Sequence, residues 1–249
     1  MYFAAHYMNL IARICALGAV ALLAGCQSAQ HVSKQAEPIK GAPAPAPEIK
    51  VTIERLGGGS TTADFNFKNL PKPARNDAAT TAQFTLVDGR QDPNGENIDK
   101  LHDGQIPRQE DQPQRNFFFA QGTDGGRILV DLGKATSLKQ VNSYSCHPGS
   151  RGPQVYNLFA SDGQAGNFNP QPKKDTDPEK CGWKLIAKVD THTSPGEPGG
   201  THGASISSSS GAIGNYRYLL FDIYQTENSD SFGNTFYSEI DVIEQNGPA

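Results

Sequence analysis

Residues 183–190 read Trp-Lys-Leu-Ile-Ala-Lys-Val-Asp, and this stretch gives the clearest sign of how the chain folds. Apolar side chains stand at every second position from Trp183 to Val189, and charged side chains fill the alternate positions except at Ile186. A period of two residues is what a β-strand requires when one face packs on a core and the other meets solvent. We therefore predict a half-buried strand here, with Ile186 as the one apolar residue on its polar face.

Outward from this strand, the chain after residue 49 repeats the same kind of pattern. Helix signals are nearly absent, and dipeptides that favour turns, such as Asp88-Gly89 and Asp162-Gly163, separate short apolar stretches. These stretches predict an all-β domain, a sandwich or barrel of antiparallel strands. The other predicted strands are 84–87, 128–132, 155–160, 216–223 and 236–243.

Two flanking features are assigned to the same domain. Residues 50–54 and 65–67 predict an extra hairpin or a pair of edge strands, within an N-terminal β extension that covers residues 49–83. Residues 164–180 and 193–202 form long polar insertions between strands. Loops of this length in a compact domain are usually functional or mobile, although both could also be solvated connections with no role in binding.

The N-terminus carries the pattern of a secretory signal. Arg13 is the only formally charged side chain before position 26, and a run of apolar and small residues follows it from Ile14 to Gly25. This run is shorter than the roughly 20 apolar residues of a membrane-spanning helix, and a positive residue before a short apolar run is typical of a signal peptide. We predict that residues 1–25 are a signal peptide and that the chain leaves the cytoplasm.

Leu23-Ala24-Gly25-Cys26 resembles the lipobox of bacterial lipoproteins. The resemblance implies that Cys26 becomes the acylated, palmitate-bearing N-terminus of the mature chain, and Gln27 after it implies sorting to the outer membrane. Several acyl chains together make membrane anchoring stable. The expected location is therefore the cell envelope, with the chain held by its lipid anchor. An ordinary cleaved signal followed by a chance cysteine is the alternative.

Between the anchor and the domain, residues 26–48 are polar and end in alternating alanine and proline. Such a sequence favours extended, semi-rigid conformations and forms no core, so we predict a disordered linker that holds the domain off the membrane. The net charge of −4, without a basic cluster, makes nucleic acid an unsuitable partner.

Two cysteines, Cys146 and Cys181, lie within the predicted domain. Outside the cytoplasm an even number of cysteines usually forms disulfides, so we expect these two to be joined. Two buried free thiols are the alternative. No Cys-x-x-Cys or Cys/His spacing indicates a zinc site.

Five stretches of the predicted domain form an ordered set along the chain. They are Ile128-Leu129-Val130-Asp131-Leu132-Gly133, residues 154–163 with their Ser-Asp-Gly turn, Trp183, Tyr216-Arg217-Tyr218 and Tyr237-Ser238-Glu239-Ile240. In this order they resemble the strands of discoidin domains, also called coagulation factor type C domains. The resemblance implies that residues 84–249 form a galactose-binding-like jelly roll, a β-sandwich of two antiparallel sheets with ligand-binding loops at one rim.

The same resemblance implies a structural calcium ion. The family often holds one between an early Asp-Gly loop and a glutamate on the last strand, and the matching positions are Asp103 and Glu239. Backbone carbonyls of Leu101 and Ser238 could supply more of the about six to eight oxygens that calcium takes. The family's usual Thr-x-Trp after the Asp-Gly is missing, and residues 107–111 stand in its place. A capped turn at Asp103 and a rim carboxylate at Glu239 are the alternative.

Candidate ligand-binding residues lie in two predicted rim loops. His147 and Arg151 follow a strand end, and Arg151 offers a rigid fork of donors, although it could instead pair with a carboxylate inside the domain. Tyr224, Asn228 and Phe232 belong to the loop before the last strand. Phe232 could be a stacking platform for a sugar or a plug beneath the loop.

No catalytic residues are predicted, because the sequence lacks Gly-x-Ser-x-Gly, His-Glu-x-x-His and Ser-x-x-Lys motifs. We expect a membrane-anchored module that binds carbohydrate and has no catalytic activity. One alternative is a structural envelope lipoprotein that docks onto another protein, which an exposed apolar patch of roughly several hundred Å² would favour. Another is a hydrolase or its accessory subunit, which converging carboxyl groups with shifted pKa values would favour.

Overall fold

The computed structural model describes residues 47–57, 63–192, 199–226 and 234–246. The chain divides into two compact units, Met1–Ala44 and Pro45–Ala249, and all the described residues belong to the second. The predicted signal peptide, the acylation site at Cys26 and most of the linker therefore lie outside the described residues. Across those residues, the structure contains no helix with the length and apolar character needed to cross a bilayer.

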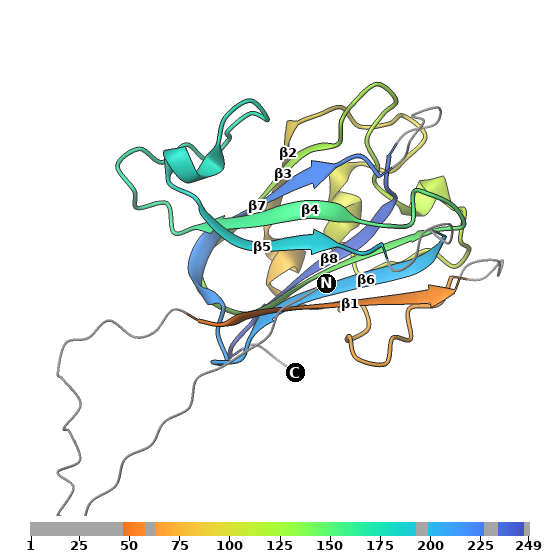
Figure 1. Ribbon diagram of the computed structural model, residues 1–249, viewed down its shortest axis with the longest axis horizontal. Coiled ribbons are helices and arrows are strands. Elements are labelled where there is room, and N and C mark those ends of the chain that lie inside the picture. The colour runs from red at the N-terminus through yellow and green to blue at the C-terminus, as the bar shows by residue number, and fades with distance from the viewer. Residues whose placement is uncertain (1–46, 58–62, 193–198, 227–233, 247–249) are drawn as a thin grey trace, which may run out of the picture. The chain divides into compact units, whose positions relative to one another are not determined.

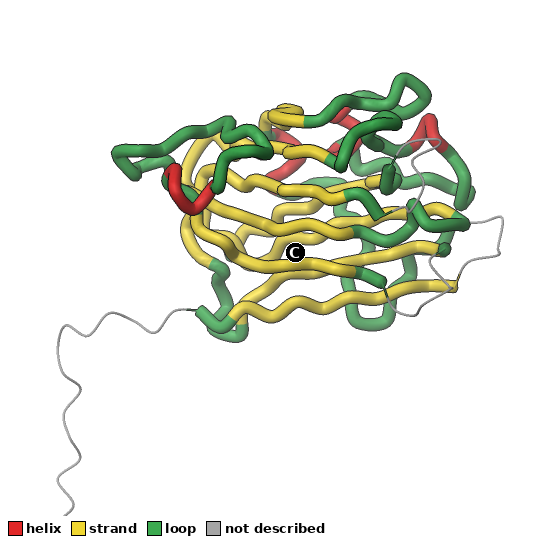
Figure 2. Tube along the Cα trace, turned by 45° about the horizontal axis from the view of Figure 1, so that its top comes forward, coloured by secondary structure: helices red, strands yellow, loops and turns green. Residues whose placement is uncertain are grey.

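The folded unit is built from antiparallel strands, as the sequence predicts (Figures 1 and 2). The helices of the described part are short 3-10 turns. These turns are η1 Ala78–Thr81, η2 Ile98–His102, η3 Pro113–Arg115 and η4 Pro178–Cys181. The strands are β1 Ile49–Gly57, β2 Gln83–Asp88, β3 Gly126–His147, β4 Val155–Ser161, β5 Lys184–Asp190, β6 Gly200–Ser208, β7 Gly214–Tyr224 and β8 Tyr237–Glu244.

The long strand β3 belongs to two layers. Its first half, residues 126–131, pairs with β2 and β7, and its second half, residues 138–147, pairs with β6 and β8. The pairing of β3 with β7 shifts register between Asp131 and Thr136, where Gly133 adopts a φ of 76°. The β4 layer thus contains β2, the first half of β3, β7, β4 and β5, and the β6 layer contains β1, β6, the second half of β3 and β8. Because β1 also contacts β5, the two layers make a nearly closed, barrel-like sandwich.

Side chains from both layers fill the space between them. Every second residue of a strand faces this interior, as the pleat of a strand requires. Leu158 of β4, Phe221 of β7, Ile206 of β6 and Val242 of β8 are all fully buried in one cluster. Burial of about 25 cal/mol per Å² of apolar surface makes this interior the main source of stability.

Strand β5 corrects one detail of the prediction. Leu158 pairs with Ala187, whereas the next residue of β4, Phe159, pairs with Leu185, so Ile186 is the extra residue of a β-bulge. A bulge reverses the faces of the residues on either side of it. Ala187 and Val189 consequently pack in the interior, but Trp183 and Leu185 pack on the outer face of the β4 layer. The prediction that these four share one face was wrong.

The loop of residues 164–180 covers that outer face. Phe168 from the loop packs against Trp183 and Tyr218, with ring centroids 5.4 Å and 5.0 Å away. The indole Nε1 of Trp183 donates a hydrogen bond to the carbonyl of Asn169 at 2.8 Å. Part of this insertion is therefore a lid on a second apolar cluster, a role that the sequence analysis did not assign.

Two parts of the β6 layer were predicted wrongly. Strand β6 begins at Gly200, within a stretch predicted as a loop, and it pairs along its whole length with β1. Residues 193–198 of the same predicted loop lie outside the described residues. Residues 65–67 are not a strand; they lie over the outer face of this layer, where the rings of Phe65 and Phe67 pack against Tyr144. A side chain on Gly203 would meet the Phe67 ring at 3.0 Å, which explains why so small a residue stands in the middle of a strand.

The predicted disulfide is wrong, because Cys146 and Cys181 are both free thiols. Cys146 is buried on the outer face of the β6 layer, where its Sγ lies 3.3 Å from Thr201 Oγ1. Cys181 ends η4 and packs with Trp183 outside the β4 layer. The two thiols thus belong to separate clusters, and a count of cysteines carries no information about which face each one occupies.

Candidate functional site

A cleft of about 530 Å³ opens where several loops meet at the rim of the sandwich. We call it the rim cleft. Segments distant in sequence build it, since its lining runs from the turn after β2 to the residue before β8. Its lining residues are Asp92, Asn94, Asp111, Pro113, Gln114, Phe118, Gln121, Arg151 and Phe236.

Aromatic rings form the floor of the rim cleft. Phe118 and Phe236 are stacked, with centroids 4.3 Å apart, and both are almost completely buried. The guanidinium of Arg151 lies over the Phe236 ring, 5.6 Å from its centroid. The backbone N–H of Phe236 also donates to the carbonyl of Arg151 at 3.0 Å, so the ring and the arginine are fixed to each other.

A carboxylate also lines the cleft. Asp92 is 6% exposed, and its Oδ1 accepts hydrogen bonds from the backbone N–H and the side-chain amide of Asn94, both at 2.9 Å. Its backbone N–H donates to the carbonyl of Phe118 at 3.0 Å, which ties Asp92 to the aromatic floor. The cleft therefore presents a carboxylate, amides and a guanidinium whose positions are set before any ligand arrives.

Of the predicted ligand-binding residues, Arg151 lines the rim cleft, and His147 lies behind it. The His147 ring meets Phe236 edge-on at 4.8 Å. Burial and the neighbouring positive charge of Arg151 lower the pKa of His147 to about 4, so its ring is neutral at pH 7. Its Nδ1 accepts a hydrogen bond from the N–H of Gly149 at 2.9 Å. His147 supports the floor of the cleft.

Tyr224, another predicted contact, does not line the rim cleft. Tyr224 lies on the outer face of the β4 layer, where its hydroxyl donates to Asp222 Oδ2 at 2.7 Å and Lys174 Nζ lies 4.1 Å from its ring centroid. Asn228 and Phe232 lie outside the described residues. Phe118 and Phe236 were not predicted as site residues, and Phe236 fell within the predicted strand 236–243. Alternation along Phe117, Phe118 and Phe119 is the signal for the first of these, because neighbouring rings must face opposite sides.

The residues predicted to hold calcium come close to one another. The N–H of Gly104, next to Asp103, lies 3.4 Å from Glu239 Oε1. The ammonium group of Lys100, however, donates to Asp103 Oδ1 at 2.5 Å and to the carbonyl of Gln105. The positively charged ammonium group of Lys100 therefore already contacts the oxygen atoms that would otherwise bind a calcium ion.

The other two predicted residues, Leu101 and Ser238, were expected to offer only their backbone carbonyls, and their side chains serve the fold. Leu101 is a fully buried core residue, and Ser238 Oγ donates to Asn116 Oδ1 at 2.7 Å. In the described part of the chain, no three His, Cys, Asp or Glu side chains cluster in a way that could hold a metal. The residues present do not fit a calcium ion.

Two buried carboxyl groups lie near this loop on the outer face of β8. Burial, together with the charge of Asp241, raises the pKa of Glu239 to about 9. Burial and the charge of Asp77 raise the pKa of Asp241 to about 7, and its Oδ2 accepts from the N–H of Ala74 at 3.0 Å. Neither side chain lines the rim cleft or the neighbouring cleft described next. These carboxyl groups are shifted because they are buried, and a substrate in either cleft would not reach them.

A second cleft has a volume of about 1050 Å³, and we call it the arginine cleft. Arg75, Arg108 and Arg115 line it from three separate segments, together with Gly104 and Ile106. Only one of the three side chains makes a hydrogen bond, since Arg115 Nη1 donates to Gln105 Oε1 at 2.7 Å and the other two have no partner among the described residues.

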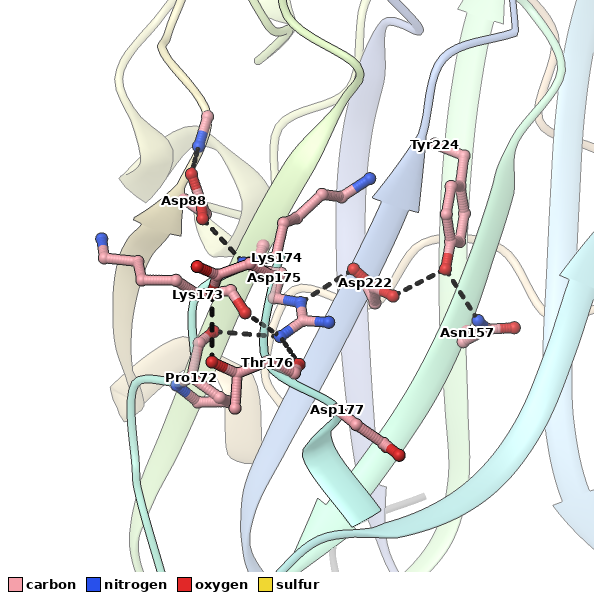
Figure 3. Close-up of polar contacts among 12 residues, drawn as sticks. Asp88, Asn157, Pro172, Lys173, Lys174, Asp175, Thr176, Asp177, Asp222 and Tyr224 are labelled. Carbon is pink, nitrogen blue, oxygen red and sulfur yellow. Dashed lines mark hydrogen bonds and ion pairs between the residues drawn. The ribbon is translucent and has the colours of Figure 1, made fainter. Parts of the chain in front are cut away.

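A buried ion pair fixes the loop over the β4 layer (Figure 3). Arg127 Nε donates to Asp222 Oδ1 at 2.9 Å, and its Nη1 donates to the carbonyls of Lys173 and Thr176 at 2.6 and 2.8 Å. Asp222 also accepts from the Tyr224 hydroxyl, as Figure 3 shows. The guanidinium thus joins the loop to Asp222 of β7, and this network is structural.

No protein-family model matches the chain, and no curated protein matches it in sequence. Among solved structures, it is similar to the chitosan-binding module 1 of a chitosanase/glucanase from Paenibacillus sp. IK-5, with 16% identity, a TM-score of 0.43, and coverage of 67% of this chain and 98% of that one. It is also similar to the CBM32 of AlyQ, solved with 4,5-unsaturated mannuronic acid, with 15% identity, a TM-score of 0.39, and coverage of 65% and 93%. A Ruminococcus gnavus GH29 fucosidase has 18% identity and a TM-score of 0.42, over 70% of this chain but 28% of the fucosidase.

Proposed function

We propose that this chain is a non-catalytic module that binds glycans in the rim cleft. The observation that carries the proposal is that Arg151 and Asp92 line one cleft, each held by contacts within the chain. Sugar hydroxyls both donate and accept hydrogen bonds, so a cleft that offers a donor fork and a carboxylate suits them. Groups that are already positioned lose little conformational freedom on binding.

The aromatic floor limits how a sugar can bind. Phe118 and Phe236 are 2% and 1% exposed, so they offer ring edges and a firm base in place of an open stacking platform. Recognition in this cleft would therefore depend on hydrogen bonds to hydroxyls. Such sites favour particular hydroxyl arrangements, because a buried polar group that loses its partner is costly.

The competing functions find less support in the described residues. Among their large apolar side chains only Val51 and Ile53, at 37% and 39%, are exposed, and both lie on β1. Two such side chains fall short of the apolar patch that protein docking would favour. The shifted carboxyl groups of Glu239 and Asp241 do not converge on a cleft, which removes the observation that would favour a hydrolase.

The proposal includes the expected location. A chain acylated at Cys26 and extended through the linker to residue 48 would display the rim cleft outside the cytoplasm. Globomycin, which blocks the signal peptidase of lipoproteins, tests this part: the mature, membrane-bound form should fail to accumulate. A C26A variant that still partitions with membranes would rule the anchor out.

Binding in the rim cleft is tested with a glycan array followed by calorimetry on the best neutral sugar. R151A should weaken binding at least tenfold, since it removes a charged donor, while leaving the melting temperature nearly unchanged (~1.4 kcal/mol is tenfold in affinity). R217A, which removes an arginine that pairs with Asp131 away from this cleft, is the matched control and should bind as the wild type does. Equal binding by wild type and R151A would contradict the proposed site.

A further inference from the structure

The loop around Lys100 is built like a cation site with the cation supplied by the chain. Lys100 stands in η2, and its side chain is 4% exposed. The chain then turns back at Gly104, whose φ is 68°, so that the Asp103 carboxylate and the Gln105 carbonyl both meet the same ammonium group. Asp103 Oδ1 also accepts from the N–H of Gln105 at 2.8 Å, which closes the loop.

We infer that the Lys100 ammonium takes the place of the calcium ion that the resemblance to discoidin domains implies. The contacts carry this inference, because an ammonium group satisfies a carboxylate and a carbonyl as a bound cation would. Two positive charges a few ångströms apart repel strongly in a poorly solvated loop. A calcium ion could therefore bind only after the buried lysine had left.

Glu239, the other predicted ligand, is not among the acceptors of the Lys100 ammonium group in the described part of the chain. Its Oε1 lies 3.4 Å from the N–H of Gly104, and its Oε2 is buried without a hydrogen-bond partner among the described residues. The contacts that hold the ammonium group are those to Asp103 and Gln105.

Thermal unfolding of the full chain tests the inference directly. Millimolar calcium chloride or EDTA should leave the melting temperature of the wild type unchanged, since a ligand bound only by the folded state must raise it. Terbium, added as a luminescent substitute for calcium, should give no sensitised emission from the wild type. A melting temperature that rises by several degrees in calcium, or a saturable terbium signal, would overturn the inference.

Variants distinguish a lysine that takes the place of an ion from a buried lysine with no such role. K100Q should melt several degrees lower than the wild type and regain stability in millimolar calcium, because its loop then offers a carboxylate and a carbonyl without a charge between them. K139Q removes an exposed lysine of the same charge. It should change neither the melting temperature nor its response to calcium. A K100Q variant that is as stable as the wild type, or that ignores calcium, overturns the inference. If K100Q does not fold, the wild-type measurements still decide.

A second inference rests independently on the arginine cleft. Arg75 and Arg108 are exposed and line one cleft, and their guanidinium groups have no partner among the described residues, although the chain as a whole carries a net charge of −4. The acidic residue that shares the lining, Asp103, is already paired with Lys100. Three guanidinium groups that gather around one cleft present a surplus of charged, forked donors.

We propose that the arginine cleft binds a glycan unit that carries an oxyanion. Planar guanidinium groups bind carboxylate and sulfate oxygens through paired hydrogen bonds. Since Gly104 and Ile106 also line the cleft, it offers contact for the ring of a sugar. The site is separate from the rim cleft, so its ligand need not be the neutral sugar proposed there.

The test uses oligogalacturonate, its carboxyl-reduced neutral counterpart and dextran sulfate as probes in calorimetry at low salt. An R75A/R108A variant should lose at least tenfold in affinity for one charged probe and leave binding of neutral sugars unchanged. The R151A variant, in turn, should bind the charged probe with the affinity of the wild type. The result for the arginine cleft is therefore distinguishable from the result for the rim cleft. Equal binding of charged and reduced probes by the wild type would overturn the proposal. The same holds if the charged probe binds R75A/R108A and wild type alike.

Discussion

The guanidinium of Arg127 lies 2.9 Å from the carboxylate of Asp222, and both side chains are buried beneath the loop of residues 164–180. Three backbone carbonyls of that loop, from Pro172, Lys173 and Thr176, accept hydrogen bonds from the same arginine. One side chain of a central strand therefore decides whether a long polar loop stays in place. The loop in turn covers the apolar cluster around Trp183.

Removing Arg127 should destabilise the domain severely. R127M leaves the Asp222 carboxylate buried without its partner, and breaking a buried pair in this way costs about 3–5 kcal/mol. Urea unfolding monitored by Trp183 fluorescence measures the loss, and a red shift of the emission before unfolding would report that the loop has lifted. R217M is the control, because the pair of Arg217 with Asp131 is half exposed and its loss should change stability little.

Most of the fold follows from local pattern, and the exceptions have a common physical cause. Strands rich in large apolar side chains, such as β2, β4 and β7, were predicted nearly to their ends. Strand β6 was not, because both of its faces are covered and it needs small residues such as Gly203, which read as a loop. Whether a distant segment covers the second face of a strand depends on the tertiary structure. The alternation of apolar and polar residues along the strand does not report it.

Only part of the candidate site could be predicted, because the rest also depends on contacts that form in the folded protein. Arg151 could be assigned to a rim loop from its position after a strand, and Asp103 could be placed near Glu239 through the family resemblance. Lys100 reads in sequence as an exposed charge on a turn. Lys100 is held in the loop because the chain brings the Gln105 carbonyl back to its ammonium group. This contact exists only in the folded loop.

The two thiols should react independently of each other. Burial raises the pKa of Cys146 to about 11, so its thiolate is scarce at pH 7, whereas Cys181 is partly exposed. Iodoacetamide should therefore label Cys181 in the native protein and Cys146 only after unfolding, as read by peptide mass spectrometry. Dithiothreitol should leave the melting temperature unchanged. Recovery of a linked Cys146–Cys181 peptide from the unreduced protein would show that the disulfide forms after all.

Gly125 should tolerate no side chain. Its φ is 60°, and a Cβ atom there would lie 2.2 Å from the carbonyl oxygen of Ile223 on the neighbouring strand. G133A is a matched control, because Gly133 also has a positive φ, 76°, but an added Cβ meets no described atom within 4 Å. G133A should cost about 1–2 kcal/mol from backbone strain alone. G125A should cost clearly more, or fail to fold, and equal losses measured by chemical unfolding would contradict the close approach.

Stability should fall as the pH rises from acidic to alkaline values, because of Glu239 and Asp241. Their pKa values in the folded protein are about 9 and about 7, above the ordinary values of 4.5 and 3.8. A carboxyl group with a raised pKa binds its proton more tightly in the folded state, so its contribution is complete below the ordinary value and disappears as pH passes the raised one. Each such proton can change the free energy of unfolding by up to about 1.4 kcal/mol per pH unit within that window.

In E239Q, an uncharged amide replaces the acid, so the decline between pH 5 and 9 should become shallower and the variant should be the more stable protein at pH 9. E179Q, which alters an exposed glutamate, should follow the wild-type curve. Urea unfolding at several pH values measures these curves, and a wild-type stability that rises from pH 5 to pH 9 would mean that neither carboxyl group is protonated in the folded state.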